Sequence, residues 1–503
     1  MSARIYFSCL GLLFSSLACN LPETNLPTPI DGSIPFTQLG AATITPFLPP
    51  TRGPNDPIFT PTPDSLQALP TIRSEAVNHT VQANDTVGVI ANAYGVTIEA
   101  MIAANDLPNL NVLSIGQVLV VPAPVFSSNG SAFKIIPDSE LVNGPANAAF
   151  NIEGFVNSYP GYLEAYSEEV EGQFLNGWQI IDRVAAFYSV NPRLLLVLLE
   201  HQSGWLTNPN PPVDTLSYPM GLIDEFRSGL YRQLSWAANN LNMGYYLWKI
   251  NAVGMWRTTD GVIIPVEAGI NAGTAGVQHM YSSLYDEASW TIAVGEEGLF
   301  KTYNRLFGYP FDWTIEPLVP ASLTQPAFQL PFETGVPWIF TGGPHDGWDV
   351  GSAWAALDFA PSSEQQGCAQ KDEWVVAVAD GLIVRAENGG VFQDLDNDGA
   401  EQTGWTVFYM HIETRERVQA GQFVRAGERI GHPSCEGGFS SGSHLHLARK
   451  YNGEWISADG AIPFVMDGWT TVGDGIYYGG ALLRGNLRVE PCECREPENM
   501  VQR

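Results

Sequence analysis

"SGSHLHLARK", residues 441–450, decides the fold of the C-terminal part of this chain. His444 and His446 are two positions apart, and apolar residues stand between and after them. On a β-strand, residues two apart project from the same face. The stretch therefore predicts a strand that carries two imidazoles on one face and follows the glycine- and serine-rich loop 437–442.

Other metal-ligating residue types lie upstream of this strand. Five of the eight histidines fall between His345 and His446, with Asp358 among them, and His411 ends the apolar run 407–410. Zinc hydrolysis needs three nitrogen or oxygen ligands, an open position for water, and free imidazoles that move protons. We therefore predict that these side chains converge on one zinc ion.

Short apolar or alternating runs dominate the chain from about residue 325 onward. They lie at 373–379, 381–386, 405–412 and 445–448, and glycine and aspartate separate them. Such runs are typical of strands. The expected scaffold of the metal site is a mainly antiparallel β domain.

Three segments carry a family resemblance: "GGPHDGWDVGSAWAALDFAP" (342–361), "FYMHI" (408–412) and "SGSHLHLARKYNGEWI" (441–456). They resemble the lysostaphin/LytM-type zinc endopeptidases, most closely the β-lytic, LasA-like branch, which cleave peptide bonds of peptidoglycan. The resemblance implies that the zinc ligands are His345, Asp358 and His446. It also implies that His411 and His444 are the catalytic histidines.

Asp349 is a rival ligand, because residues 345–349 also fit the short His-x-Gly-x-Asp spacing of the ordinary family. We favour Asp358, since Leu357 and Phe359 flank it on the opposite strand face and would fix its carboxylate. Asp349 sits among glycines.

Two weaker signals lie in the same region. Asp394, Asp396 and Asp398 have the spacing of a Ca²⁺ loop, but an EF-hand needs glutamate where Trp405 stands. We expect either a calcium turn of another kind or a solvated acidic hairpin. Residues 438–442 match the serine-hydrolase elbow, yet they precede a strand instead of joining strand to helix. This position disfavours Ser440 as a nucleophile.

Residues 79–122 predict a compact unit of strand, two capped helices and strand. They resemble a LysM module, a small βααβ α+β fold, in their Asp-Thr, Tyr-Gly-Val, Ala-Ala-Asn and Ile-Gly-Gln signposts. The resemblance implies binding of N-acetylglucosamine-containing glycan near Asp85, Thr86 and Asn105. Asp85 and Thr86 also suit a helix cap, and both roles are compatible.

Residues 140–320 predict an all-α middle domain, with helices at 177–188 and 192–202. "VNPRLLLVLLEHQSGWL" (190–206) resembles the catalytic helix of lysozyme-like lytic transglycosylases, whose general acid is a glutamate. Gln202 stands there, and an amide has no acid proton to give. Glu200 lies two residues away, which turns its side chain by roughly 200°. We therefore expect either a degenerate relative that holds glycan without cleaving it, or an ordinary helical spacer domain.

The N-terminus reads as an export signal: Arg4, an apolar run 5–17 and small residues before Cys19. Residues 17–20 resemble a bacterial lipobox with Cys19 as the lipidated residue, and ordinary signal cleavage is the alternative. A Pro- and Thr-rich spacer follows. Export leaves Cys368, Cys435, Cys492 and Cys494 available for disulfides, and we predict the pair Cys368–Cys435. The cysteines lack the paired CxxC spacing of zinc sites.

The net charge of −29 over 503 residues argues against nucleic acid or an anionic membrane surface as a partner. The length predicts several domains. The expected boundaries are 1–19 (signal), 20–75 (spacer), 76–123 (LysM), 140–320 (helical), 325–485 (zinc endopeptidase) and 486–503 (tail).

The expected function is that of an extracytoplasmic cell-wall hydrolase, lipid-anchored or secreted. Its zinc endopeptidase domain would cleave peptidoglycan peptides, and its LysM module would bind the glycan. The alternative is a non-catalytic, peptidoglycan-binding scaffold of the envelope.

Overall fold

The computed structural model describes residues 47–53, 61, 64–70, 73–82, 85–105, 107, 113–124, 126, 130–362, 367–494 and 496–503. The predicted signal segment and Cys19 lie outside these residues. None of the helices within them combines the length and the apolar character that crossing a membrane requires.

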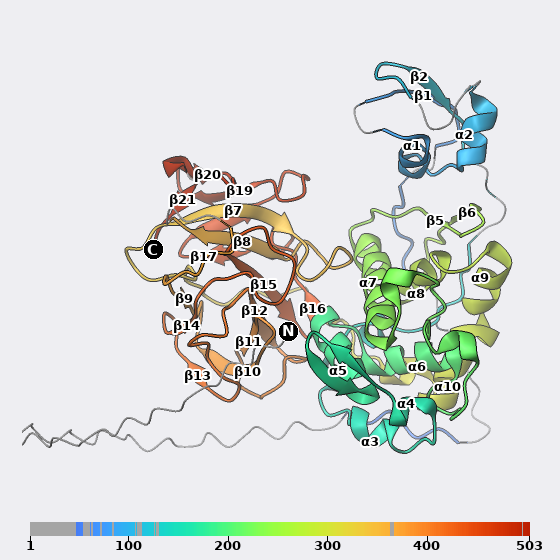
Figure 1. The fold of residues 1–503 in the computed structure, drawn as a ribbon, viewed down its shortest axis with the longest axis horizontal. Helices are drawn as coiled ribbons and strands as arrows, with labels where there is room; N and C mark the ends of the chain where they lie inside the picture. Colours follow the sequence, from blue (N-terminus) through green and yellow to red (C-terminus); the bar gives the residue numbers. More distant parts are fainter. Residues whose placement is uncertain are drawn as a thin grey trace, which may run out of the picture. The chain divides into compact units, whose positions relative to one another are not determined.

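The first unit has the expected strand–helix–helix–strand order (Figure 1). It consists of β1 (Val77–Thr80), α1 (Val87–Ala93), α2 (Ile98–Ala104) and β2 (Val118–Val121), and the two strands pair antiparallel. Thr97 caps α2 by accepting a hydrogen bond from the Ala100 amide, as its sequence position predicts. The unit encloses its own small core around Ile90, Met101 and Leu119.

The middle segment is mainly helical. Its helices are α3 (Ile152–Val156), α4 (Tyr162–Ala165), α5 (Gly177–Tyr188), α6 (Pro192–Ser203), α7 (Leu230–Lys249), α8 (Ala272–Ser282), α9 (Glu287–Ala293) and α10 (Lys301–Phe307). Asn176 forms a capping box at α5, and Asn191 with Pro192 opens α6.

The all-α prediction for this segment missed two short hairpins. They are β3 (Ser167–Val170) with β4 (Gln173–Asn176), and β5 (Met255–Arg257) with β6 (Ile263–Pro265). The first turns at Glu171 and Gly172, which both have positive φ, as a two-residue hairpin turn requires. Glutamate is an unusual residue for that conformation, so the turn carried no sequence signal.

The C-terminal segment is built on one nine-stranded sheet, drawn from yellow to red in Figure 1. Its order is β13 (Phe423–Val424), β10 (Gly381–Glu387), β11 (Gly390–Asp394), β12 (Trp405–Met410), β15 (Leu445–Tyr451), β8 (Ala356–Pro361), β7 (Trp338–His345) and β21 (Met500–Val501), with β16 (Glu454–Trp455) also on β15. Every pair in it is antiparallel, as predicted.

Two smaller sheets complete this segment. They are β9 (Val375–Val376) with β14 (Arg429–Gly431), and the meander β17 (Val465–Met466), β18 (Trp469–Val472), β19 (Ala481–Arg484) and β20 (Leu487–Val489). The strand predicted at 373–379 is thus only two residues long, since the chain pairs there with the short β14.

The two faces of the large sheet have different partners. Val407 and Leu447 belong to the core inside the β segment. Phe408 and Ala448, which alternate with them, belong instead to the core that contains the middle helices. One face of the sheet therefore extends the helical core. The middle segment and the C-terminal segment share this buried apolar core.

Phe187 on α5 marks this shared core. Its ring lies 4.6 Å from the ring of Trp348 and 5.9 Å from that of Phe392, and the Arg385 guanidinium stacks on it at 4.4 Å. Phe187 is buried.

The predicted spacer has no helix or strand in its described residues. Two of its amides, those of Asp64 and Gln67, donate to the carbonyls of Gly269 and Ala268. These spacer residues therefore lie against the middle segment.

We predict that Phe187→Ala lowers the free energy of unfolding by about 3–5 kcal/mol, because truncation leaves a cavity between the two segments. Denaturant titration measures the change. Phe174→Ala, at an exposed ring of β4, is the control and should cost no more than about 0.5 kcal/mol. A Phe187→Ala protein as stable as the control would contradict the shared core.

Candidate metal centre

The strand register brings the predicted metal-ligating side chains together. Met410 on β12 pairs with His446 on β15, and His446 pairs with Asp358 on β8. Asp358 in turn pairs with Gly342 on β7, the strand that ends at His345. Directly opposed residues in an antiparallel pair share a face. The imidazole of His446 and the carboxylate of Asp358 therefore lie side by side.

Gly342 makes room for this carboxylate. A Cβ at that position would stand 3.0 Å from both Cβ and Oδ2 of Asp358 and 2.8 Å from the Tyr478 ring. A larger residue would therefore displace Asp358.

Three atoms form a small triangle. His345 Nε2 lies 3.0 Å from His446 Nδ1, and each nitrogen lies 3.2 Å from Asp358 Oδ1. Ligands of a tetrahedral zinc ion at about 2.0–2.1 Å stand about 3.3 Å from one another. The triangle therefore has the dimensions of a zinc site, and the three residues form one of the groups whose ligand atoms lie within 4.8 Å.

The backbone fixes the tautomer of both imidazoles. His345 Nδ1 donates to the Gly343 carbonyl at 2.8 Å, and His446 Nε2 donates to the Gly347 carbonyl at 3.1 Å. Since a carbonyl only accepts, the proton of each neutral ring is held there, and the nitrogen in the triangle is unprotonated. Such outer contacts are typical of metal-bound histidines.

Asp358 Oδ1 is buried and has no donor that satisfies hydrogen-bond geometry. Burial favours the neutral acid, but the positive charge that His345 and His444 carry when they are protonated outweighs it and holds the pKa of Asp358 well below its usual value. When these rings are neutral, that charge is missing. A buried carboxylate facing two imidazole lone pairs lacks a positive charge. A divalent cation would supply it, so these residues fit zinc.

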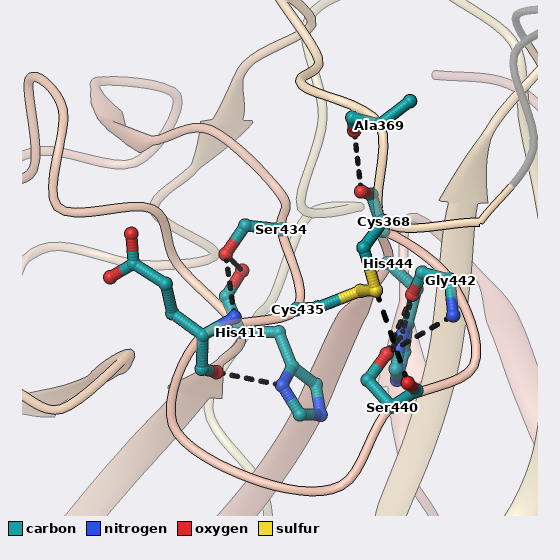
Figure 2. Close-up of a disulfide and its surroundings, with 10 residues drawn as sticks. Cys368, Ala369, His411, Ser434, Cys435, Ser440, Gly442 and His444 are labelled. Carbon is teal, nitrogen blue, oxygen red and sulfur yellow. Dashed lines mark hydrogen bonds between the residues drawn. A yellow bond between two sulfur atoms is a disulfide. The ribbon is translucent and has the colours of Figure 1, made fainter. Parts of the chain in front are cut away.

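His411 lies next to the triangle, with its ring centroid 6.3 Å from that of His446. The ring centroids of His411 and His444 are 4.4 Å apart, and Figure 2 shows both side chains. His411 Nδ1 donates to the Glu436 carbonyl at 2.9 Å, and His444 Nδ1 donates to the Gly442 carbonyl at 2.8 Å. His444 Nε2 is 3.7 Å from Asp358 Oδ2. Each neutral ring therefore keeps its Nε2 lone pair for another partner.

The protonation of His411 follows from its surroundings. Burial, and then the nearby His444 and His446 rings, lower the pKa of His411 to about 3. His411 is therefore neutral near pH 7. Its own φ is +64°, so the backbone leaves the β12 strand there and turns.

Asp349, the rival ligand, lies apart from the triangle. It is exposed, and its Oδ2 accepts a hydrogen bond from Tyr188 of α5 at 3.0 Å. Gly351, two residues on, donates to Asn239 of α7 at 2.7 Å. The loop between His345 and Asp358 is thus held by the middle helices, and the carboxylate of Asp349 is part of that contact.

Sequence reasoning missed two tyrosines beside the triangle. The Tyr478 ring stacks on His345 with centroids 4.1 Å apart, and Tyr477 donates to Asp346 Oδ2 at 2.6 Å. Burial raises the pKa of Asp346 to about 6. Both rings come from the loop between β18 and β19 and stay partly exposed. The only sequence signal was a tyrosine pair between glycines.

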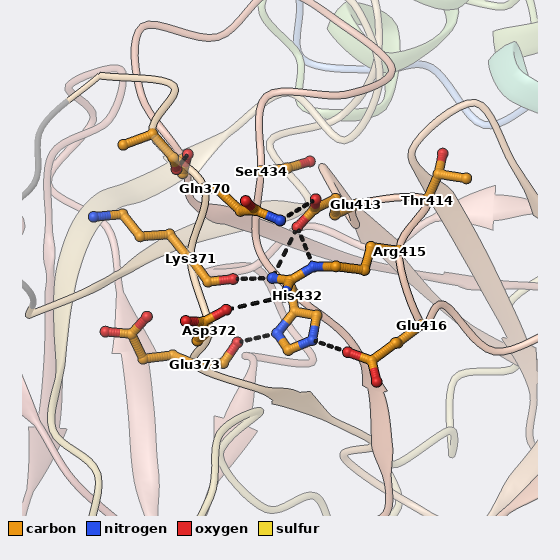
Figure 3. Close-up of polar contacts among 12 residues, drawn as sticks. Gln370, Lys371, Asp372, Glu373, Glu413, Thr414, Arg415, Glu416, His432 and Ser434 are labelled. Carbon is orange, nitrogen blue, oxygen red and sulfur yellow. Dashed lines mark hydrogen bonds and ion pairs between the residues drawn. The ribbon is translucent and has the colours of Figure 1, made fainter. Parts of the chain in front are cut away.

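His432, the remaining histidine of this region, belongs to a separate polar network (Figure 3). Its Nδ1 donates to the Glu373 carbonyl at 3.0 Å, and its Nε2 lies 3.1 Å from Glu416 Oε2. The Trp374 ring packs on it at 3.8 Å.

The weaker candidates have structural partners. Ser440 Oγ donates to the Gly442 carbonyl at 2.7 Å and lies 3.2 Å from His444 Nδ1, the protonated side of that ring, so no base faces it. Asp394, Asp396 and Asp398 form a second group with ligand atoms within 4.8 Å of one another. Asp394 already accepts from three backbone amides, those of residues 396, 397 and 399.

The predicted glycan residues also have local partners. Asp85 Oδ2 accepts from the Gln82 amide at 2.7 Å and lies 2.8 Å from His79 Nε2, and Thr86 Oγ1 accepts from the Val89 amide. The side-chain nitrogen of Asn105 donates to the carbonyls of Met101 and Val120, and its side-chain oxygen accepts from the Val120 amide. These bonds join α2 to β2.

The residues of the lysozyme-like helix have partners in the middle segment. Glu200 accepts four hydrogen bonds, three from Leu206 and Thr207 and one from Arg305, which makes it a structural anchor. Gln202 accepts from Tyr285.

Comparison with known proteins gives three family matches. Residues 79–122 match the LysM domain, residues 134–320 match the LasA N-terminal domain, and residues 365–458 match peptidase family M23. The match to the LasA N-terminal domain does not test the lysozyme-like resemblance of the middle segment.

Two curated relatives and one solved structure are similar to this chain. Protease LasA of Pseudomonas aeruginosa is 26% identical over 395 residues, which cover 75% of this chain and 84% of the relative. The beta-lytic metalloendopeptidase of Achromobacter lyticus is 29% identical over 140 residues, 26% of this chain and 35% of the relative. The deep-sea M23 metalloprotease pseudoalterin aligns at 24% identity with a TM-score of 0.28, over 36% of this chain and all of that structure.

We predict that Asp358→Asn weakens zinc binding at least 100-fold, because the substitution removes the negative charge among the ligand atoms. Competition with a chromophoric chelator measures the affinity. Asp349→Asn is the matched control and should bind zinc as the unaltered protein does. If Asp349→Asn weakened zinc binding and Asp358→Asn did not, Asp349 would be the zinc ligand instead of Asp358.

Proposed function

We propose that this chain, a LytM-type, LasA-like metalloendopeptidase that carries a LysM domain, acts outside the cytoplasm and cleaves peptide bonds in peptidoglycan. His345, Asp358 and His446 would hold one zinc ion. His411 and His444 would be the catalytic histidines.

One observation carries the proposal: two imidazole nitrogens and one carboxylate oxygen lie 3.0–3.2 Å apart, beside two more imidazoles whose Nδ1 atoms are held by backbone carbonyls. When bound, zinc acts as a Lewis acid on the scissile carbonyl and lowers the pKa of water toward about 7. The cluster thus has the parts of a metal-dependent hydrolase.

The histidine pair supplies the proton transfers that peptide hydrolysis needs. One neutral Nε2 accepts a proton as the water oxygen attacks the carbonyl carbon, and the resulting imidazolium later returns it to the leaving amine nitrogen. A protonated ring beside the carbonyl oxygen would also stabilise its developing negative charge. The oxygen of water ends in the new carboxylate, and the peptide nitrogen leaves as a free amine.

The peptidoglycan assignment is supported by the combination of domains. LysM modules bind N-acetylglucosamine-containing glycan, so this unit would place cross-link peptides near the metal site through a tether. Its separate core supports an independent module.

A non-catalytic scaffold is not favoured. Binding alone gives no reason to bring five ligand and proton-transfer groups to one point, nor to fix the tautomers of four imidazoles with carbonyls. The middle segment has no acid at Gln202, and its Glu200 carboxylate is engaged by Arg305 and Thr207. We therefore assign no glycan cleavage to it.

The proposal extends to export and to a second cation. Residues 1–19 would direct export, and lipidation of Cys19 would anchor the protein at the outer face of a membrane. The turn at Asp394, Asp396 and Asp398 would either bind Ca²⁺ or form a solvated acidic hairpin.

We predict that the full-length protein releases free amines from purified peptidoglycan, that chelation abolishes the release and that zinc restores it. His411→Ala and His444→Ala should each lower kcat by about 10²- to 10⁴-fold, the usual contribution of general acid–base catalysis. Asp349→Asn serves as the active control. New reducing ends would indicate glycan cleavage instead, and no free amines under any metal condition would favour the scaffold.

We also predict that deletion of residues 76–123 lowers hydrolysis of insoluble peptidoglycan by about 100-fold, because the tether is lost. Hydrolysis of soluble cross-linked muropeptides should keep its kcat, since the metal site is unchanged. Parallel assays on the two substrates measure this. Equal losses on both would show that the module contributes to folding instead.

A further inference from the structure

The Cys368–Cys435 disulfide, predicted from the sequence and present in the structure, joins two loops beside the histidine pair (Figure 2). Cys368 follows β8 and is exposed, whereas Cys435 lies between β14 and β15 and is partly buried. The bridge spans 67 residues.

The loop of Cys435 holds His411 at three points. The Ser434 amide and Oγ donate to the His411 carbonyl at 2.6 and 2.9 Å. The backbone carbonyl of Glu436, on the other side of the cysteine, accepts a hydrogen bond from His411 Nδ1 at 2.9 Å. The Glu436 carboxylate also accepts from the amide and hydroxyl of Thr414. Both neighbours of Cys435 therefore set the position of the His411 ring.

The loop of Cys368 holds the residues before His444. The Ser443 amide donates to the Gly367 carbonyl at 3.0 Å, and its hydroxyl donates to the Ala369 carbonyl at 2.6 Å. Both neighbours of Cys368 thus bind Ser443. The His444 amide also reaches the Ser434 carbonyl, at 3.3 Å, which links the two loops at the pair itself.

The metal triangle is held by other means. The pairing of β8 with β15 places Asp358 beside His446, and the carbonyls of Gly343 and Gly347 orient the two ligand imidazoles. Opening the disulfide removes none of these contacts. The disulfide thus affects the positions of His411 and His444 and leaves the metal ligands in place.

We propose that the Cys368–Cys435 disulfide is a positioning element that sets the separation of His411 and His444, so that turnover depends on its oxidation while zinc binding does not. This inference rests on the proposed function. It adds a thiol sensitivity that the zinc chemistry alone would not have.

Reduction can be carried out with a reagent that does not compete strongly for zinc. A water-soluble trialkylphosphine gives two electrons to the sulfur–sulfur bond and takes one oxygen atom from water as the phosphine oxide. The two hydrogens of that water complete the thiols of Cys368 and Cys435. The exposure of Cys368 gives the phosphine access.

The test compares full-length Cys368→Ser/Cys435→Ser protein with the unaltered protein on soluble cross-linked muropeptides. We expect kcat to fall by about 10²-fold, the effect of a misplacement of about 1 Å in a reacting group. KM and zinc affinity should stay within about twofold. Ser434→Ala, which keeps the disulfide but removes one bond to His411, should give a smaller fall in kcat.

The matched control is Cys492→Ser/Cys494→Ser, which removes the second disulfide. Cys492 and Cys494 contact Phe340 and Asn499. This variant should keep full kcat and should lose activity to the phosphine as the unaltered protein does.

Two results would overturn the inference. One is an unchanged kcat in the Cys368→Ser/Cys435→Ser protein. The other is a parallel loss of zinc affinity and kcat, which would mean that the substitutions disturb the metal ligands as well as His411 and His444. An unaltered protein that is inactive with zinc would instead contradict the proposed function, and this inference with it.

Discussion

The pairing of His446 with Asp358 across β15 and β8 is the contact on which the candidate site depends. It is fixed by the core beneath it, because Leu445 and Leu447 alternate with His446 and pack on the other face of the sheet. A shift of the β15 register by one residue would turn the His446 imidazole into that core and would turn Leu445 and Leu447 toward the metal position. The apolar residues therefore enforce the geometry of the ligands.

The face that carries the triangle is also the face that packs against the middle helices. Phe408 and Ala448, two residues from Met410 and His446 along their strands, belong to the shared core. Trp348, from the loop between His345 and Asp358, packs on Phe187 in that core. An isolated β segment would expose these side chains, so the middle segment contributes to the stability of the site and to the shape of its ligand loop.

The sequence predicted the parts of the site that depend on strand periodicity. The spacing of His444 and His446 and the apolar run before His411 were sufficient to place His446 on a strand. His444 precedes that strand, and His411 follows the neighbouring strand β12, so both lie directly beyond strand ends of the same sheet. The preference for Asp358 rested on its apolar neighbours, and the structure puts it, and not Asp349, beside the imidazoles. The Tyr188 contact of Asp349 joins residues 161 positions apart, which no local pattern reveals.

Other features could not be predicted because they arise from tertiary contacts. Tyr478 reaches His345 from a glycine-rich loop whose local sequence gives no sign of this contact, and the Glu171 turn adopts a backbone conformation that its residue type disfavours. The helix cap at Thr97 and the Cys368–Cys435 bridge were predicted correctly, the first from a local rule and the second as one of several pairings.

Crystals of the full-length protein grown with zinc test the central claim most directly, through anomalous diffraction at the zinc absorption edge. We expect one strong peak about 2.0–2.2 Å from His345 Nε2, Asp358 Oδ1 and His446 Nδ1. A peak only at the Asp394–Asp398 turn, or none within bonding distance of Asp358, would contradict it.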